Sequence, residues 1–341
     1  MKKSLMTLGV LALFVLMAYG QEKKFALYSV AFYNMENLFD TIHDEGKNDY
    51  EYLPNGTNQW NTMKYKAKLK NMSEILSMLS TDKLPMGPAI IGVSEIENYR
   101  VLEDILKQPA LADRGYQYIH YEGADQRGVD CAFFYNPKLF ELTNSKLVPY
   151  VYINDTVHKT RGFLIASGNI AGEKMHFIVN HWPSRAAASP ARERAGEQVR
   201  AIKDSLLRED SAAKIVIMGD MNDDPMDKSM AVALGAKRKP ADVGPTDLYN
   251  PWWDTLKKGY GTLMYKGKWN LFDQIVFTGN LLGTDRSTLK FYKHEIFSRD
   301  FMFQKEGKYK GYPKRTQAGG VWLNGYSDHL PTIIYLIKEV K

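Results

Sequence analysis

Cysteine is almost absent from this chain, which has 341 residues and a single cysteine, Cys131. The chain therefore cannot form an internal disulfide, and burial of apolar side chains must stabilise the fold. Cys131 lies within the apolar, strand-like run 129–135. We interpret it as a small buried side chain, which disfavours both a disulfide-stapled fold and a cysteine nucleophile.

The sequence also lacks a linker rich in proline, glycine or serine, a long run of like charges, and an internal repeat. Apolar strand-like runs recur from residue 25 to residue 337. These features predict a single domain over residues 21–341, a length that can bury one large core.

Long hydrophobic runs are missing except at the N-terminus, where two lysines precede an apolar stretch over residues 5–18. The segment Ala18-Tyr19-Gly20 follows, in the small-x-small pattern of a cleavage site. The stretch of 14 residues is shorter than the roughly 20 that span a bilayer. Because Gln21 stands where a lipid-anchored protein would have cysteine, a lipid anchor is also disfavoured. The pattern predicts a signal peptide over residues 1–20, cleaved after Gly20, and a periplasmic or secreted protein without a stable membrane anchor.

A strong charge of one sign is absent as well. The formal net charge is +6 and falls to +4 without the two lysines of the predicted signal peptide. Such a mild positive bias suits an anionic substrate but constrains partners weakly. Nothing in the sequence indicates an obligate protein partner.

Apolar runs and their spacing predict the secondary structure. Strands are expected at residues 25–33, 89–93, 116–121, 129–135, 163–169, 175–180, 214–218, 274–277 and 332–337. Helices are expected at residues 63–79, 101–106 and 191–207. Strands and helices interleave irregularly, and several neighbouring strands resemble hairpins. This mixture favours two packed mixed sheets flanked by helices over a doubly wound parallel sheet.

The residues with the most chemical information follow directly after the apolar run 215–218, in the segment Gly219-Asp220-Met221-Asn222-Asp223-Asp224-Pro225. Carboxylates and an amide at the end of a buried strand can supply oxygen ligands to a hard cation and meet a phosphate. Taken alone, the segment is also what an aspartate-rich turn that caps a strand looks like.

Five other apolar runs end at acidic, amide or histidine residues, at 33–37, 93–98, 180–185, 271–275 and 327–331. Each of these alone is typical of a turn, a helix cap or a packed histidine. Together they contain carboxylates for a divalent cation, amides for a phosphate and two histidines that can move protons. These are the parts needed for metal-assisted attack of water on a phosphoester.

With these motifs in this order, the chain resembles the endonuclease/exonuclease/phosphatase superfamily, whose members are similar to deoxyribonuclease I. The most specific motifs are Gly219-Asp220-Met221-Asn222 and Ser327-Asp328-His329, and the resemblance extends over residues 34–329. Residues 33–40 also resemble the opening of a bacterial subgroup, so a secreted bacterial member is implied. The resemblance implies an α/β (α+β) fold, a four-layer α/β/β/α sandwich with two packed mixed β-sheets and the active site at one edge.

The resemblance also implies a metal site. Glu95 matches the principal metal carboxylate of the family, and Glu36 and Asp328 match acidic positions that complete or lie beside the metal shell. An oxygen-only shell suits Mg²⁺ or Mn²⁺ better than zinc. We therefore expect Mg²⁺, with Mn²⁺ as a substitute.

The implied catalytic residues are Asp220, Asn222, His329, Asp273 and His181. Asp220 matches the carboxylate that orients the attacking water. His329 matches the histidine that contacts the scissile phosphate or activates water, and Asp273 matches the carboxylate that fixes its tautomer. His181 matches a second histidine, which would protonate the leaving oxygen. Which histidine is the acid and which the base stays open.

Phosphate binding is implied for the amides of Asn34 and Asn222. Two further assignments rest on sequence position alone. Arg185, four residues beyond His181, either binds phosphate oxygens or is a solvated residue before the next helix. Asp130 either orients His181 or pairs with Arg127.

The stretch from residue 301 to residue 315 interleaves aromatic and basic side chains next to Ser327-Asp328-His329. It is either a groove for a nucleic acid strand or a surface loop whose rings pack on the domain. We expect a metal-dependent phosphoesterase, with nucleic acid as the favoured substrate. The alternatives are a phosphatase or phosphodiesterase for lipid head groups (sphingomyelinase-like), inositol phosphates or nucleotides, and a catalytically inactive binding module.

Overall fold

The computed structural model describes residues 23–153, 155 and 157–340. The signal peptide expected over residues 1–20 lies outside the described residues. Among the helices that are described, none is long and apolar enough to cross a membrane.

The first of two large sheets has six strands in the order β14-β17-β1-β2-β4-β3. Its long central strand, β1 (Lys24–Leu38), pairs antiparallel with β17 (Thr332–Val340) and parallel with β2 (Ile90–Ile96). The remaining strands of this sheet are β3 (Gln117–His120), β4 (Asp130–Tyr135) and β14 (Lys290–Ile296).

The second sheet has seven strands in the order β5-β6-β7-β8-β13-β10-β9. At its centre, β7 (Glu173–His181) pairs parallel with β8 (Lys214–Asp220), which pairs antiparallel with β13 (Asp273–Thr278). The outer strands are β5 (Glu141–Val148), β6 (Phe163–Ile170), β9 (Ala236–Lys237) and β10 (Leu248–Tyr249). Both large sheets are therefore mixed, as the sequence predicts.

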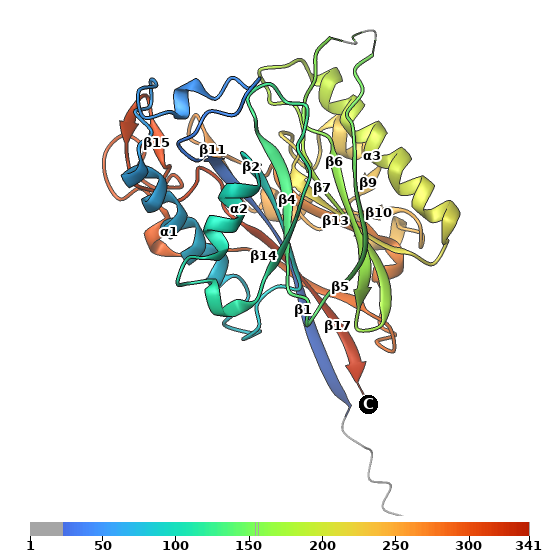
Figure 1. Ribbon diagram of the computed structural model, residues 1–341. Helices are drawn as coiled ribbons and strands as arrows, with labels where there is room; N and C mark the ends of the chain where they lie inside the picture. The colour runs from blue at the N-terminus through green and yellow to red at the C-terminus, as the bar shows by residue number, and fades with distance from the viewer. Residues whose placement is uncertain (1–22, 154, 156, 341) are drawn as a thin grey trace, which may run out of the picture.

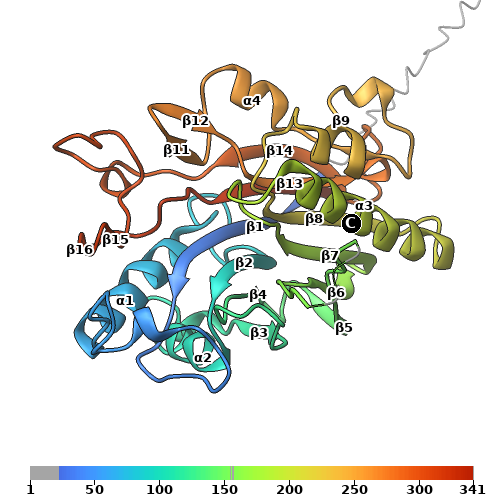
Figure 2. The same cartoon turned by 90° about the horizontal axis from the view of Figure 1, so that it is seen from above.

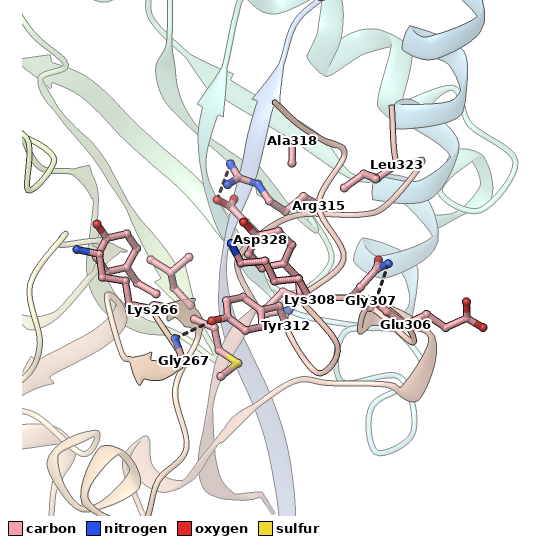
Figure 3. Close-up of a pocket in the computed structure, with 16 residues that line it drawn as sticks. Lys266, Gly267, Glu306, Gly307, Lys308, Tyr312, Arg315, Ala318, Leu323 and Asp328 are labelled. Atoms are coloured by element: carbon pink, nitrogen blue, oxygen red, sulfur yellow. Dashed lines mark hydrogen bonds and ion pairs between the residues drawn. The ribbon is translucent and has the colours of Figure 1, made fainter. Parts of the chain in front are cut away.

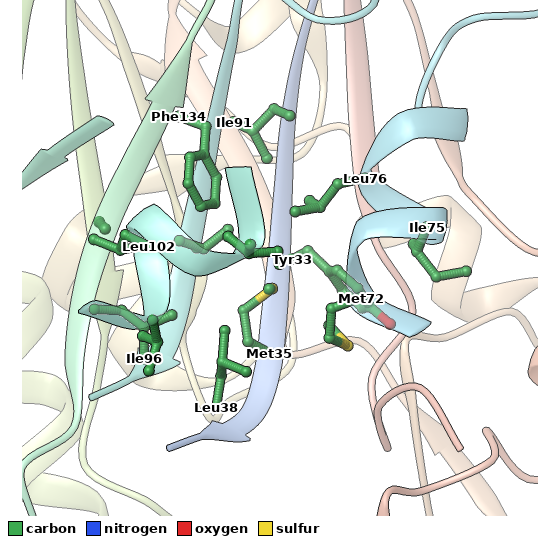
Figure 4. Close-up of a cluster of buried hydrophobic side chains, with 14 of the residues drawn as sticks. Tyr33, Met35, Leu38, Met72, Ile75, Leu76, Ile91, Ile96, Leu102 and Phe134 are labelled. Carbon is green, nitrogen blue, oxygen red and sulfur yellow. The ribbon is translucent and has the colours of Figure 1, made fainter. Parts of the chain in front are cut away.

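Helices cover the outer faces of the two sheets (Figures 1 and 2). α1 (Thr62–Met78) and α2 (Tyr99–Leu106) bury their apolar sides against β1, β2 and β4. Figure 4 shows this contact, with Leu76 of α1 and Leu102 of α2 on either side of Tyr33. α3 (Ser189–Glu209) packs on the other sheet through Ala195, Val199 and Leu206.

A third apolar cluster fills the space between the sheets. Phe32 and Phe133 come from the first sheet, and Phe177, Val216 and Met218 come from the second. The layers are thus helix, sheet, sheet and helix, which confirms the predicted four-layer α/β/β/α sandwich. Burial of large apolar side chains in three layers provides the stability that a chain with one cysteine needs. Cys131 is itself buried in the layer between the sheets, where burial raises the pKa of its thiol.

All nine predicted strands and all three predicted helices are present. The structure also contains elements that the sequence does not reveal, because they are short or half-exposed. One is the edge strand β5, in which no residue is fully buried. The further elements are α4 (Trp253–Lys257), the hairpin of β11 (Leu263–Tyr265) and β12 (Lys268–Asn270), the hairpin of β15 (Gln317–Ala318) and β16 (Val321–Trp322), the π-helix Ser229–Leu234, and the 3-10 turns Tyr50–Tyr52, Ala112–Arg114, Pro240–Asp242, Gly279–Leu281 and Asp300–Met302.

Strand direction brings the polar strand ends together. β1 and β2 are parallel, as are β7 and β8. The ends of these four strands meet at one edge of the two sheets, where Asn34 contacts Asp220 and Glu95 lies near His181. β13 and β17 run the other way and begin there, with Asp273 paired in register with Asp220. β1 runs to Leu38, five residues beyond its predicted end, because its pairing with β2 resumes after a register shift at Asn34.

Candidate active site

Asn34 links carboxylates from the two sheets. Its Nδ2 donates hydrogen bonds to Glu95 Oε1 at 3.1 Å and to Asp220 Oδ2 at 3.0 Å. The second oxygen of Glu95 accepts a bond from the backbone N–H of Asn37 at 3.0 Å. Asn34 and Asp220 are buried, whereas the Glu95 carboxylate keeps partial access to solvent. The amide thus holds an acidic pair at the edge of the sandwich.

His181 faces the same acidic pair. Its Nε2 lies 3.7 Å from Glu95 Oε1 and 3.8 Å from Asp220 Oδ2, and the three side chains each offer a ligand atom within 4.8 Å of the others. Two carboxylates held this close in a buried site repel one another unless a cation offsets their charge. Their oxygens therefore fit a divalent cation.

His329 and Asp273 form a second group with Asp220. His329 Nδ1 lies 2.7 Å from Asp273 Oδ2, and its Nε2 lies 3.9 Å from Asp220 Oδ2. Asp273 is fully buried at the first position of β13. A bond from Nδ1–H to this carboxylate leaves Nε2 directed toward Asp220, which is the orienting arrangement found in hydrolase triads.

The two histidines differ in their electrostatic surroundings. Burial, with the nearby positive charges of Arg161 and Arg127, lowers the pKa of His181 well below its ordinary value. Burial also acts to lower the pKa of His329, but the carboxylates around it, Asp273 foremost, outweigh this and raise it well above its ordinary value. Burial raises the pKa of Asp220 to about 7. The surroundings of the two histidines therefore shift their pKa values in opposite directions, downward for His181 and upward for His329.

Glu36 and Asp328, the other expected metal carboxylates, are joined by Arg315. Glu36 Oε1 accepts a hydrogen bond from Arg315 Nε at 2.8 Å, and its Oε2 accepts one from the backbone N–H of Thr316 at 2.7 Å. Arg315 Nη2 lies 3.0 Å from Asp328 Oδ2. Lys68 Nζ is 3.9 Å from Glu36 Oε2. Both oxygens of Glu36 are thus engaged by protein donors, and its role as a metal ligand stays a prediction.

Lys68 and Arg315 are site residues that the sequence interpretation missed. Lys68 is fully buried on α1, where it also donates to the backbone oxygen of Tyr326 at 2.7 Å, and burial lowers its pKa to about 8. A signal was present, because Lys68 occupies the apolar side of the predicted helix, three residues after Tyr65 and four before Met72. A lysine at such a position indicates a buried anionic partner.

Asn222 and Arg185 organise the loop after β8. Asn222 donates from its backbone N–H to Asp220 Oδ1 at 2.9 Å and from Nδ2 to the Trp182 backbone oxygen at 3.0 Å. Arg185 Nε donates to the Asn222 backbone oxygen at 3.1 Å, and its Nη2 lies 2.8 Å from Asp227 Oδ2. The Arg185 guanidinium is therefore already paired with acidic groups, and its phosphate-binding role stays a prediction.

A sequence profile of the endonuclease/exonuclease/phosphatase family matches residues 29–338, a range that contains every strand end of the site. The chain belongs to this family. Its members hydrolyse phosphoester bonds and depend on divalent metal ions, so this chain is a phosphoester hydrolase whose acidic cluster fits the metal that the family uses.

Solved structures share the fold of this family member. A family protein from Bacteroides thetaiotaomicron is 15% identical with a TM-score of 0.57, and the match covers 93% of this chain and 97% of the other. A mannosyl-6-phosphatase from the same organism is 15% identical (TM-score 0.55; 91% and 99% covered). D. rerio TDP2, complexed with a single-strand DNA product, is 14% identical (TM-score 0.52; 91% and 99% covered). Similarity this low shows the fold alone. A search of curated protein sequences found no match.

One sequence assignment for this family member is wrong. Asp130 Oδ2 accepts a hydrogen bond from the Gly123 backbone N–H at 3.0 Å and lies 3.1 Å from His120 Nε2. It therefore neither orients His181 nor pairs with Arg127, because its carboxylate contacts Gly123 and His120 instead. His181 Nδ1 has no hydrogen-bond partner among the described residues.

The backbone adopts an uncommon conformation at four polar residues of the site. Glu36, Asn37, Glu95 and Asn222 all have positive φ, between 45° and 58°. Non-glycine residues seldom adopt this conformation, and such residues cluster at functional sites where the surrounding structure holds them in place. These four positions lie in the strand ends and loops that carry the polar side chains of the site.

Proposed function

We propose that this protein is a periplasmic or secreted, Mg²⁺-dependent phosphodiesterase that cleaves nucleic acid. The observation that carries the proposal is the arrangement around Asp220, which adjoins both the Asn34–Glu95 pair and the His329–Asp273 pair. This is a cation site next to an oriented proton-transfer group, which is what hydrolysis of a phosphoester requires.

In the proposed mechanism, Glu95 and Asp220 would hold the cation, which when bound would offset negative charge on the phosphate. Water attacks phosphorus, the bond to the leaving oxygen breaks, and one proton must move from the water while another reaches the leaving group. Asp220 is placed to orient the water. His329, fixed by Asp273, contacts the phosphate or transfers a proton, and His181 supplies a second ring nitrogen near the same oxygen of Asp220.

The nucleic acid assignment is supported by the mild positive charge and by the lysine and tyrosine side chains beside Asp328. The structural neighbours include TDP2, complexed with a single-strand DNA product, and a mannosyl-6-phosphatase, so the fold accommodates more than one kind of phosphoester. The proposed location rests on the N-terminal sequence.

The test is hydrolysis by the purified chain starting at Gln21, with Mg²⁺ and with a chelator. The substrates are single-stranded and duplex DNA, RNA, sphingomyelin and mannose 6-phosphate. We expect metal-dependent loss of a nucleic acid, reduced about 10²-fold or more in Asp220→Asn and unchanged in Asp285→Asn, an exposed aspartate far from the site. Glu95→Gln should raise the Mg²⁺ concentration needed for half-maximal rate.

Two results would contradict the proposal. Turnover of mannose 6-phosphate or sphingomyelin alone would support the hydrolase assignment but rule out nucleic acid as the substrate. Full activity of Asp220→Asn on any substrate would mean that the site is elsewhere. Added salt provides a second readout, because binding of a strand through several phosphates weakens steeply with salt.

A further inference from the structure

A cavity of about 700 Å³ opens beside the catalytic edge, with Arg315 and Asp328 in its lining. Figure 3 shows the side chains that surround it, and the aromatic and basic ones are Tyr265, Lys266, Lys308, Tyr309, Tyr312 and Arg315. Its volume is within the range of sites that bind small organic groups.

Two hairpin-like segments form the walls, and hydrogen bonds hold them in place. The β11–β12 hairpin turns at Lys266-Gly267, where both residues have positive φ, as a tight two-residue turn requires. The opposite wall is the loop that follows Phe303, which is closed by a backbone bridge between Phe303 and Pro313. The Tyr312 hydroxyl accepts a bond from the Gly267 N–H at 2.6 Å and ties the two walls together (Figure 3). The cavity is therefore preformed.

The cavity is continuous with the catalytic residues. Leu263 of β11 forms a backbone bridge with His329, and the Leu330 N–H donates to the Thr262 backbone oxygen at 2.8 Å. Asp328, the neighbour of His329, lines the cavity itself. The cavity therefore adjoins the residues that would hold the phosphate.

The lining suits a flat aromatic ring. Tyr265 and Tyr309 are 61% and 52% exposed, which is high for large rings. The amino groups of Lys266 and Lys308 lie over these rings, at 5.2 Å from the Tyr265 centroid and 5.5 Å from the Tyr309 centroid. Aromatic rings next to cations are what single-stranded nucleic acid sites use, with bases on the rings and phosphates at the cations.

A sugar ring is a poorer fit, since it needs several acceptors for its hydroxyl groups. The amide and carboxylate acceptors in the lining are those of Gln304, Glu306 and Asp328, and Arg315 already binds Asp328. We propose that this cavity binds the nucleobase adjacent to the scissile phosphate, with Tyr265 and Tyr309 as the stacking residues. The inference rests on the proposed function, because it names the part of a nucleic acid that the same site recognises.

The test measures binding without turnover. The chain starting at Gln21 is titrated calorimetrically, in chelator, with adenosine 5′-monophosphate, ribose 5-phosphate and mannose 6-phosphate. We expect the nucleotide to bind about tenfold or more tightly than ribose 5-phosphate, because stacking of one base contributes about 1–3 kcal/mol. Tyr309→Ala and Tyr265→Ala should each reduce this preference, and Tyr309→Phe should retain it.

The matched control is Tyr292→Ala, a tyrosine on β14 that is 49% exposed and outside the cavity lining. Equal affinity for the nucleotide and ribose 5-phosphate, or tighter binding of mannose 6-phosphate, would overturn the inference. So would an unchanged preference in both tyrosine variants. These failures are separate from failure of the proposed function, which would be the absence of hydrolysis of every nucleic acid with Mg²⁺ present.

Discussion

At the scale of single residues, the site depends on polar side chains that hold one another in position through hydrogen bonds and ion pairs. Asn34 donates to two carboxylates, Asp273 orients His329, and Arg315 joins two acidic side chains. In a buried site such contacts count for more than in water, because an unpaired partner would have no solvent to replace it. Removing one partner should therefore change the chemistry before it changes the fold.

Asp273→Asn tests this dependence. The variant amide can donate to His329 Nδ1, which favours the tautomer with the proton on Nε2 and removes the charge that stabilises the imidazolium. We expect turnover to fall about 10²-fold or more, with little change in KM. The measurement is steady-state kinetics on the substrate that the hydrolysis test identifies. Asp254→Asn, an exposed aspartate paired with Arg238, is the control and should keep full activity. Equal turnover in Asp273→Asn would show that Asp273 does not orient His329 for catalysis.

At the scale of elements, β7 and β8 approach each other closely at the catalytic edge. Gly219 precedes Asp220, and a Cβ at this position would lie 2.3 Å from the Asn180 backbone oxygen and 2.8 Å from Asn180 Cβ. Both of these neighbours belong to a central strand that cannot shift without moving His181. The glycine therefore lets the strands that carry Asp220 and His181 lie side by side.

Gly219→Ala should separate these two strands. We expect a loss of about 1–3 kcal/mol in the free energy of unfolding, together with a fall in turnover because Asp220 moves. The measurements are urea unfolding and steady-state kinetics. Gly172→Ala, in an open turn where no atom lies within 4 Å of the added Cβ, should lose some stability through its positive φ but keep its activity. Wild-type turnover in Gly219→Ala would show that the approach of the strands does not position Asp220.

At the scale of the whole molecule, the stability of the fold should depend on pH through a histidine outside the site. His294 of β14 lies 2.9 Å from the Thr255 hydroxyl and is in edge contact with the Trp252 ring. Burial, with a smaller effect of Lys258, lowers its pKa to about 4. The folded protein thus binds the proton less readily than the unfolded chain, in which histidine titrates near about 6.5.

The sign of the pH effect follows from this difference. The contribution of His294 is fully present above about pH 6.5 and is lost progressively as the pH falls. By about pH 4 the loss amounts to about 3 kcal/mol. We expect urea unfolding to show a loss of about 2 kcal/mol between about pH 7 and about pH 5 that is absent in His294→Gln. His158→Gln, an exposed histidine, is the control. An identical pH dependence in wild type and His294→Gln would exclude this role.

Much of the architecture was readable from the sequence because apolar runs and helical spacing are local signals. Buried strands such as β8 are continuous apolar segments, and the polar residues that follow them mark the edge where the site forms. Edge elements such as β5 and the short β11–β12 hairpin were missed, because half-exposed strands carry no continuous apolar run.

The sequence by itself determined the layered fold class, the family, and the set of polar residues placed at strand ends. Only the tertiary structure decided which of these residues meet. Arg315 reaches Glu36 across 279 positions, and Lys68 reaches Tyr326 across 258. Asp130 meets His120 and not His181. The cavity beside Asp328 exists because two loops close over one another. Strands form from local periodicity, whereas side-chain partners depend on sheet register and loop closure, which bring together residues that are distant in the chain.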